Sequence, residues 1–220
     1  MIIECLGYPA SGKTHLIKCI KKKYKNITFP DIEYDDSSIL KKMLFLLSFL
    51  LKKMFNKNLR KKYKVGKHLI NESIKIDNRK LKKYFLKRFI QEYALLDKYS
   101  HLTKSIIFSE SIYNYAKTIF LMRKREDLYF DFLKILPNTF KERYCFVVIK
   151  TNVDSNQKQY EQRTNKEYED SQYKEDYFLN VKAIDFILES SNIPYYYFEN
   201  LYNEESDKLF LDLFSKLISI

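Results

Sequence analysis

The sequence predicts an α/β fold that begins with a strand, a phosphate-binding loop and a helix. Residues 7–14 read Gly-Tyr-Pro-Ala-Ser-Gly-Lys-Thr, which fits the pattern Gly-x-x-x-x-Gly-Lys-Thr. The apolar run at residues 2–6 suits a buried strand before this loop. Leu16, Ile17 and Ile20 follow the loop at the spacing of a helix face. The glycine pattern alone occurs by chance, so its position between a strand and a helix makes the prediction specific.

The chemistry of such a loop indicates the class of ligand. Gly7 and Gly12 can adopt backbone angles that a β-carbon would forbid. Successive backbone N–H groups can then surround phosphate oxygens at the positive end of the following helix. We expect Lys13 to reach the β- and γ-phosphates and the Thr14 hydroxyl to bind Mg²⁺. ATP is the expected nucleotide, with GTP as the alternative. The residues expected to contact it are Gly7, Tyr8, Pro9, Ala10, Ser11, Gly12, Lys13, Thr14 and His15.

Length and composition favour one domain spanning residues 1–220. A chain of 220 residues can bury a full core, and 3 Gly and 4 Pro leave little room for a flexible linker. Cys5, Cys19 and Cys145 each lie in an apolar stretch, which indicates reduced core thiols and neither a disulfide framework nor a metal site. No signal peptide precedes the first strand. We therefore expect a cytoplasmic protein.

The net charge of +12 comes from one part of the chain. Residues 41–88 hold 17 Lys and Arg against 2 Asp and Glu, whereas the remainder holds 23 basic and 26 acidic residues. We predict a basic helical insertion at residues 38–100 that forms the acceptor side. A basic, aromatic insertion could bind nucleic acid or anionic lipid, or it could simply carry solvated lysines or shape a pocket for an anionic substrate. Nucleic acid is disfavoured, because the lysines follow no groove-reading motif.

Two helices are expected within this insertion. Residues 38–55 are apolar on nearly all sides, but the uncharged part at 43–51 is shorter than the roughly 20 residues that span a bilayer. We predict that this helix is buried between others, with a dimerisation patch or a membrane-surface contact as alternatives. A second helix at about 78–99 is predicted by a repeat at helical spacing, Leu81, Tyr84, Phe85, Arg88, Phe89 and Tyr93.

Acidic residues follow two of the predicted strands. Residues 26–29 suit a short second strand, and a cluster comes directly after it: Asp31, Glu33, Asp35 and Asp36. A carboxylate at this edge of the sheet could accept a proton from a substrate hydroxyl or hold Mg²⁺, although loop solubility and helix capping explain such residues equally well. The third strand, within 104–110, ends at Glu110. We expect Glu110 to join Thr14 at Mg²⁺, with a favourable contact to a helix dipole as the alternative.

The C-terminal part of the chain supplies two further strands and a lid-like segment. Residues 144–149 are the strongest strand signal, and residues 194–198 suit the last strand before a closing helix. Residues 151–176 are highly charged and are expected to be exposed. Arg163 in this segment could move onto a transferring phosphoryl group. His15, His68 and His101 show no metal-ligand spacing.

The chain resembles the small P-loop kinases of the nucleoside and nucleotide (thymidylate-like) kinase group. The resemblance rests on residues 7–14, on Ile-Ile-Phe-Ser-Glu at 106–110, on the strand at 144–149 with its Arg163-bearing segment, and on the final strand and helix. It implies a three-layer sandwich with a five-stranded parallel sheet flanked by helices, the donor nucleotide on the loop and a helical acceptor pocket. The arginine usual beside Glu110 is Ser111 here, and Asp31 and Glu33 stand where an acidic-arginine signature is expected.

These observations predict an ATP- and Mg²⁺-dependent phosphotransferase with a small nucleoside-, nucleotide- or sugar-like acceptor. Lys13 would hold the phosphates, Asp31 or Glu33 would orient the acceptor hydroxyl, and Arg163 would close over the phosphoryl group. The rival hypothesis is a nucleotide-dependent switch or ATPase that uses its basic insertion to bind nucleic acid, a membrane or a partner protein. Residues 39–55 are the segment expected to mediate membrane contact or homodimer formation.

Overall fold

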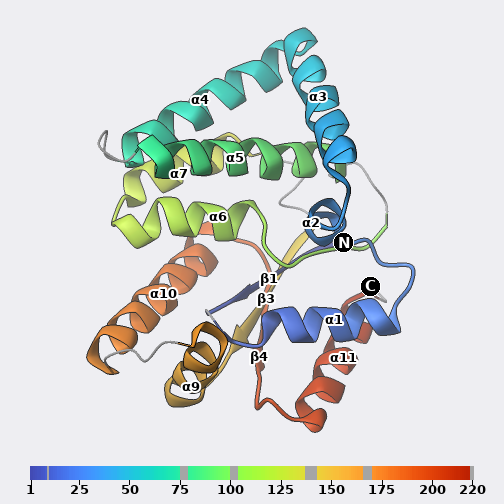
Figure 1. Cartoon of the computed structure of the whole chain (residues 1–220), viewed down its shortest axis with the longest axis vertical. Helices are drawn as coiled ribbons and strands as arrows, with labels where there is room; N and C mark the ends of the chain where they lie inside the picture. The colour runs from blue at the N-terminus through green and yellow to red at the C-terminus, as the bar shows by residue number, and fades with distance from the viewer. Residues whose placement is uncertain (9, 75–78, 100–103, 137–142, 166–169, 219–220) are drawn as a thin grey trace. The chain divides into compact units, whose positions relative to one another are not determined.

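The computed structural model describes residues 1–8, 10–74, 79–99, 104–136, 143–165 and 170–218 (Figure 1). Its backbone contacts divide the chain into two compact units. Unit 1 comprises Met1–Phe29, Thr103–Ser109 and Arg143–Ile220, and unit 2 comprises Pro30–Leu102 and Glu110–Glu142. The expectation of a single domain with residues 38–100 as an insertion stays a prediction.

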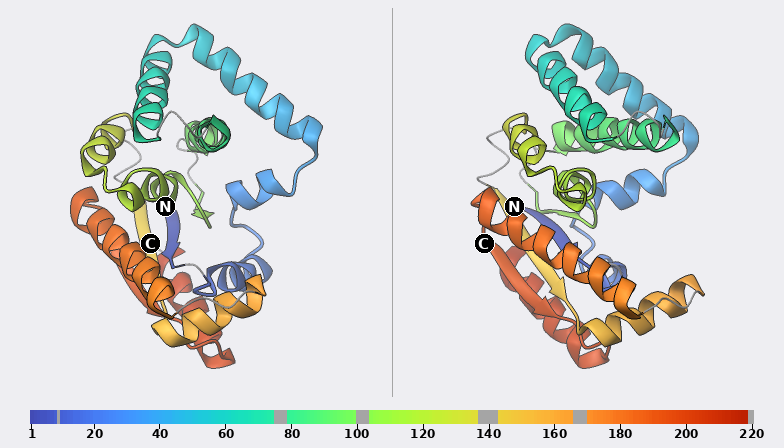
Figure 2. Two further views of the ribbon diagram at one scale, coloured as in Figure 1. Left: turned by 60° about the vertical axis from the view of Figure 1, so that its left-hand side comes forward. Right: turned by 90° about the vertical axis from the view of Figure 1, so that its left-hand side faces the viewer.

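Unit 1 is built on a parallel sheet of four strands. They are β1 (Ile2–Gly7), β2 (Ile106–Phe108), β3 (Tyr144–Lys150) and β4 (Tyr195–Glu199), in the order β2-β1-β3-β4 (Figure 2). β1 and β3 are almost wholly buried, as expected for parallel strands covered on both faces. One side chain in β1 is acidic: Glu4 is fully buried, and the Tyr144 hydroxyl donates a hydrogen bond to its Oε2 over 2.7 Å. This bond provides Glu4 with a polar partner inside the sheet.

The resemblance implies a sheet of five strands, and this number is wrong, because the sheet has four. The predicted strand at residues 26–29 forms only an isolated parallel bridge between Thr28 and Ile106. The Ile107 N–H donates to the Thr28 carbonyl over 3.0 Å, on the edge of β2. Pro30 then begins the next helix, because its fixed φ suits a first helical turn and its ring cannot continue a ladder. The chain therefore leaves the sheet after a single paired residue.

Four helices complete the described part of unit 1. They are α1 (Lys13–Lys23), α9 (Val153–Thr164), α10 (Asp170–Ser191) and α11 (Glu204–Ile218). α1 and α11 pack against each other (Figure 1). α1 buries Leu16, Ile17 and Ile20, the residues from which its inner face was predicted. The sheet is thus flanked by helices, as expected for an α/β domain.

Unit 2 is helical throughout its described residues. Its elements are α2 (Pro30–Asp35), α3 (Ile39–Phe55), α4 (Lys57–Ser73), α5 (Arg79–Tyr99), α6 (Ile112–Ile119), a 3₁₀ turn (Leu121–Arg123) and α7 (Glu126–Lys134). Phe89 lies at the centre, with its ring 5.7 Å from that of Tyr63 and 5.9 Å from that of Phe132. A β-carbon on Gly66 would collide with Phe89, so glycine allows α4 to approach α5 closely.

The prediction that the helix at 38–55 is buried is wrong. Among the residues of α3, only Phe49 is buried. Phe49 and Phe45 lie on the side facing α5, where the Phe49 ring is 6.3 Å from that of Tyr93. Most of the remaining apolar side chains are exposed, because a helix packed on one neighbour buries only one stripe. No helix in the described ranges is long and apolar enough to cross a membrane.

Candidate active site

The loop between β1 and α1 has the backbone geometry that the sequence pattern predicts. Gly12 has a φ of 77°, and a β-carbon there would collide with the Asn200 side chain. A β-carbon on Gly7 would lie 2.6 Å from Ser11 Oγ and 3.4 Å from the Ile149 carbonyl oxygen. Both positions therefore require glycine. Gly12 needs it for its positive φ, and Gly7 needs it because Ser11 and the Ile149 carbonyl lie too close for a β-carbon. Pro9, predicted to contact the nucleotide, lies outside the described residues.

The segment after β4 is hydrogen-bonded to the loop. Asn200 Nδ2 donates to the Ser11 carbonyl over 2.8 Å, and the Tyr202 hydroxyl donates to the Ala10 carbonyl over 2.6 Å. Asn200 is itself fixed, because its N–H donates to the Lys150 carbonyl at the end of β3. These two hydrogen bonds use backbone carbonyls of the loop as acceptors, and they fix the position of the loop. Sequence reasoning missed Asn200 and Tyr202. Their position directly after the end of a predicted strand could have indicated that they lie near the loop.

The residues of the loop fit a phosphate group. Ser11 is 1% exposed, and its buried Oγ has no hydrogen-bond partner in the described part of the chain. Lys13 is half-buried, and Thr14 and His15 are exposed in the first turn of α1, which carries no acidic residue. A helix N-terminus whose own first turn contains no acidic residue leaves its backbone N–H groups available to an anion. Together these features suit a phosphate chain with its bound Mg²⁺.

Aromatic side chains line the neighbouring part of unit 1. The Tyr8 ring lies 4.8 Å from that of Tyr177, whose hydroxyl donates to the Thr151 carbonyl over 2.7 Å. Burial raises the pKa of Tyr8, which therefore stays neutral at physiological pH. Arg163 lies in the last turn of α9 with its side chain exposed. Its closing movement stays a prediction.

In unit 2, the structure brings together two of the predicted acids. Asp31 is 2% exposed, and its Oδ2 accepts a hydrogen bond from the Glu110 N–H over 2.9 Å. The Glu110 side chain is about half-exposed, and Glu33 is exposed on α2. Asp31 thus has a fixed orientation, while Glu110 and Glu33 reach solvent.

An ion pair on α5, between the partly exposed Arg88 and the buried Glu92, adds a cation that sequence reasoning missed. Arg88 Nε lies 2.8 Å from Oε1 of Glu92, which is 1% exposed, and Arg88 Nη2 lies 3.9 Å from Glu110 Oε2. Burial opposes the charge of Arg88, but the carboxylates of Glu92, Asp35 and Glu110 outweigh it and raise the arginine's pKa. The signal was present in the sequence, because Arg88 falls within an otherwise apolar stripe of the predicted helix. Arg88 brings a positive charge near Glu110, where Ser111 replaces the expected arginine.

Comparisons with known proteins identify the fold. No family model matches the sequence, and no curated protein matches it either. Among solved structures, the chain is similar to the deoxyadenosine kinase of M. mycoides, determined with the products dCMP and a flexible dCDP, at 15% identity and a TM-score of 0.53. The same kinase with bound dCTP matches at 14% identity and a TM-score of 0.51. Each match covers 100% of both chains. The fold is that of a P-loop nucleoside kinase.

This result confirms an α/β fold with a parallel sheet flanked by helices, as in the similar kinase, but with four strands and not five; the basic insertion stays a prediction. β1 lies between β2 and β3 in the sheet, and its carboxyl end leads into the glycine loop. In open parallel sheets, ligands bind at the carboxyl edge where the strand connections diverge. The loop at residues 7–14 lies at that edge.

Proposed function

We propose that this protein is a kinase that transfers a phosphoryl group from ATP to a small nucleoside-like acceptor. The observation that carries the proposal is the loop between β1 and α1, with Gly12 at positive φ, within a nucleoside kinase fold. The similar deoxyadenosine kinase was determined with deoxycytidine nucleotides, which supports a nucleoside or nucleotide acceptor over a sugar. GTP remains the alternative donor.

At the donor end, the backbone amides of the loop and Lys13 would hold the β- and γ-phosphates. Phosphoryl transfer needs little covalent chemistry from the protein, so positioning and charge neutralisation are its main contributions. The bonds from Asn200 and Tyr202 to loop carbonyls support this role, because they fix the loop before the nucleotide arrives. Arg163 is proposed to add positive charge on closure. Mg²⁺, when bound, would neutralise charge on the phosphates, and Thr14 and Glu110 are its proposed ligands.

At the acceptor end, a carboxylate of α2 would accept the proton of the attacking hydroxyl. Asp31 is the better candidate, because its buried and hydrogen-bonded carboxylate has a fixed direction. Glu33 is the alternative, and its exposed side chain is the less constrained. Arg88 is proposed to bind an anionic or hydroxyl-bearing part of the acceptor with its guanidinium.

The test is an ADP-release assay with ATP and Mg²⁺ over nucleosides, nucleotides and phosphorylatable sugars. We expect ADP in stoichiometric amounts with the phosphorylated product for one class of nucleoside or nucleotide. Calorimetry with MgATP and no acceptor is the companion measurement. Nucleotide binding without transfer to any acceptor, together with hydrolysis stimulated by a polyanion, would support the switch or ATPase hypothesis in place of a kinase.

The acceptor need not be the only partner. The exposed face of α3 supports contact with a membrane surface or with a second copy of the chain. A cytoplasmic location fits Cys5 and Cys145, which are both buried and not joined in a disulfide.

A further inference from the structure

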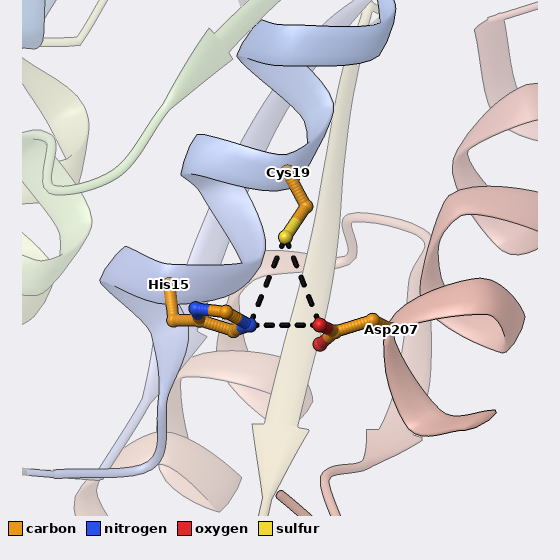
Figure 3. A group of neighbouring side chains, drawn as sticks. All are labelled: His15, Cys19 and Asp207. Carbon is orange, nitrogen blue, oxygen red and sulfur yellow. Dashed lines mark hydrogen bonds and ion pairs between the residues drawn. The ribbon is translucent and has the colours of Figure 1, made fainter. Parts of the chain in front are cut away.

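A cluster of three metal-ligating side chains lies between α1 and α11, and no step of the proposed phosphoryl transfer is assigned to these side chains. His15 and Cys19 are one turn apart on α1, and Asp207 comes from the first turn of α11 (Figure 3). The sequence predicted three core thiols and no metal-ligand spacing among the histidines. Cys19 is instead half-exposed, and its partners are a residue four positions away and another nearly two hundred positions away.

The three ligand atoms have the spacing of a metal site. His15 Nε2 lies 2.8 Å from Asp207 Oδ2, and Cys19 Sγ lies 3.7 Å from that nitrogen and 3.9 Å from that oxygen. The point equidistant from these atoms lies about 2.0 Å from each, which matches zinc bonds to nitrogen and oxygen and is short of the roughly 2.3 Å bond to sulfur. An ion displaced slightly toward solvent would lengthen all three distances without movement of the backbone.

We propose that His15, Cys19 and Asp207 form a binding site for a divalent transition-metal ion, with zinc as the metal that fits the ligands best. Thiolate and imidazole favour zinc over magnesium, and a carboxylate completes a common set of three protein ligands. The exposed His15 side chain leaves a position open for water or a fourth ligand. The ion would join α11 to the helix that directly follows the phosphate-binding loop.

Metal binding at this site requires the thiolate of Cys19. Burial and the neighbouring Asp207 carboxylate raise the pKa of the Cys19 thiol, so the metal-free protein carries the neutral thiol at physiological pH. Binding therefore releases the thiol proton to the buffer while the sulfur–metal bond forms.

Cobalt titration of protein prepared without a histidine tag and stripped with a chelator tests the site. We expect one Co²⁺ per chain with a thiolate charge-transfer band, displacement by Zn²⁺, and a higher Tm in the presence of Zn²⁺. Cys19→Ser and Asp207→Asn should each weaken binding at least tenfold. Cys145→Ala and His68→Ala, which remove a thiol and an imidazole elsewhere, should bind as the wild type does. A spectrum without the thiolate band, or equal affinity in Cys19→Ser and wild type, would overturn the proposal.

A second, independent observation concerns the outer face of α3. Seven of its apolar side chains recur at helical spacing on one side and are 47% to 87% exposed: Leu40, Met43, Leu44, Leu47, Leu51, Met54 and Phe55. We call this set the α3 stripe. Water-soluble proteins seldom expose contiguous apolar patches beyond a few hundred Å², so a stripe of this length indicates a contact surface.

The two helices that carry and follow the α3 stripe are strongly basic. Residues 39–73 contain ten Lys and Arg and one acidic residue, Glu72. α4 follows α3 directly at Asn56 (Figure 1). Five of its basic side chains are exposed: Lys57, Arg60, Lys61, Lys64 and Lys67. Pairing this surface with a second copy would bring two strongly basic segments together, which like-charge repulsion opposes. An anionic lipid surface is complementary to both features.

We infer that the α3 stripe and the basic face of α4 bind an anionic membrane surface. The apolar side chains would enter the boundary between headgroups and acyl chains, and the lysines would contact the headgroups. Each lysine or arginine near such a surface adds attraction that salt screens. Binding should therefore require both anionic lipid and the stripe.

Sedimentation with phosphatidylcholine vesicles, with and without phosphatidylglycerol, tests this inference. We expect binding to the anionic vesicles alone, a decrease at high salt, and a loss of at least tenfold in Leu44→Gln/Leu47→Gln. Leu201→Gln/Leu209→Gln removes two equally exposed leucines outside α3 and should bind as the wild type does. Retained binding in the α3 variant would overturn the inference. A wild-type dimer that becomes monomeric in the α3 variant, without vesicle binding, would assign the stripe to a second copy of the chain.

Discussion

The Oδ2 atom of Asp31 accepts a hydrogen bond from the backbone N–H of Glu110 at 2.9 Å. The two residues are 79 positions apart, and each was predicted to be functional because it follows a strand. The bond fixes the direction of the Asp31 carboxylate at the start of α2. It also ties α2 to the segment that leads into α6, within unit 2.

Substitution of Asp31 distinguishes the two candidate bases. Asp31→Asn keeps an oxygen for the Glu110 N–H but cannot take a proton from the acceptor. We expect kcat to fall by about 10²-fold or more with little change in Tm, since general-base catalysis contributes on this scale. Glu33→Gln is the matched control and should change kcat by less than about threefold. The opposite pattern, measured by ADP release, would assign the base to Glu33.

Removal of the Lys13 charge should abolish transfer while the fold remains. Lys13→Ala loses the cation proposed to hold the phosphates, and one such contact is worth about 10²–10³ in rate. Lys18→Ala, an exposed lysine further along α1, serves as the control and should turn over normally. Circular dichroism and Tm report the fold, and the ADP assay reports the rate. Unchanged turnover in Lys13→Ala would contradict the proposed mechanism.

Removing Arg88 alone should lower the free energy of unfolding more than replacing Arg88 and Glu92 together. Arg88→Met removes one ion partner of the 1% exposed Glu92, and we expect a loss of about 3 kcal/mol in urea unfolding. Arg88→Met/Glu92→Leu should recover most of this loss, because well-packed apolar residues often replace such pairs. Arg125→Met, which breaks the exposed pair with Asp127, should cause no measurable change. A double variant as unstable as the single one would show that the pair itself stabilises the unit.

The stability of the protein should decrease at alkaline pH in part through Cys145. Burial in β3 raises the pKa of this thiol from 9.0 to about 11. A raised pKa means that the neutral thiol favours the folded state, so its contribution is complete below about pH 9 and is lost as the pH rises through about 11. The two-unit shift corresponds to about 2–3 kcal/mol. Urea unfolding from pH 8 to 11 should fall less steeply in Cys145→Ala, and identical slopes would contradict this assignment.

The loop and its flanking elements were predictable from the sequence because their causes are local. Gly12 adopts the positive φ that its place in the pattern requires, and α1 buries the residues that repeat at helical spacing. The missing fifth strand shows the limit of this reasoning. The stretch at 26–29 has strand-forming residues, but pairing depends on how far the neighbouring edge of β2 extends.

The sequence by itself determined the phosphate-binding loop, the parallel α/β class and the basic character of residues 41–88, since each follows from residue type and spacing along the chain. Only the tertiary structure decided that α3 leaves one apolar face exposed, that Arg88 pairs with Glu92 beside Glu110, and that His15 and Cys19 meet Asp207. These relationships join residues whose positions depend on how helices pack. Packing is set by the whole chain and not by any local pattern.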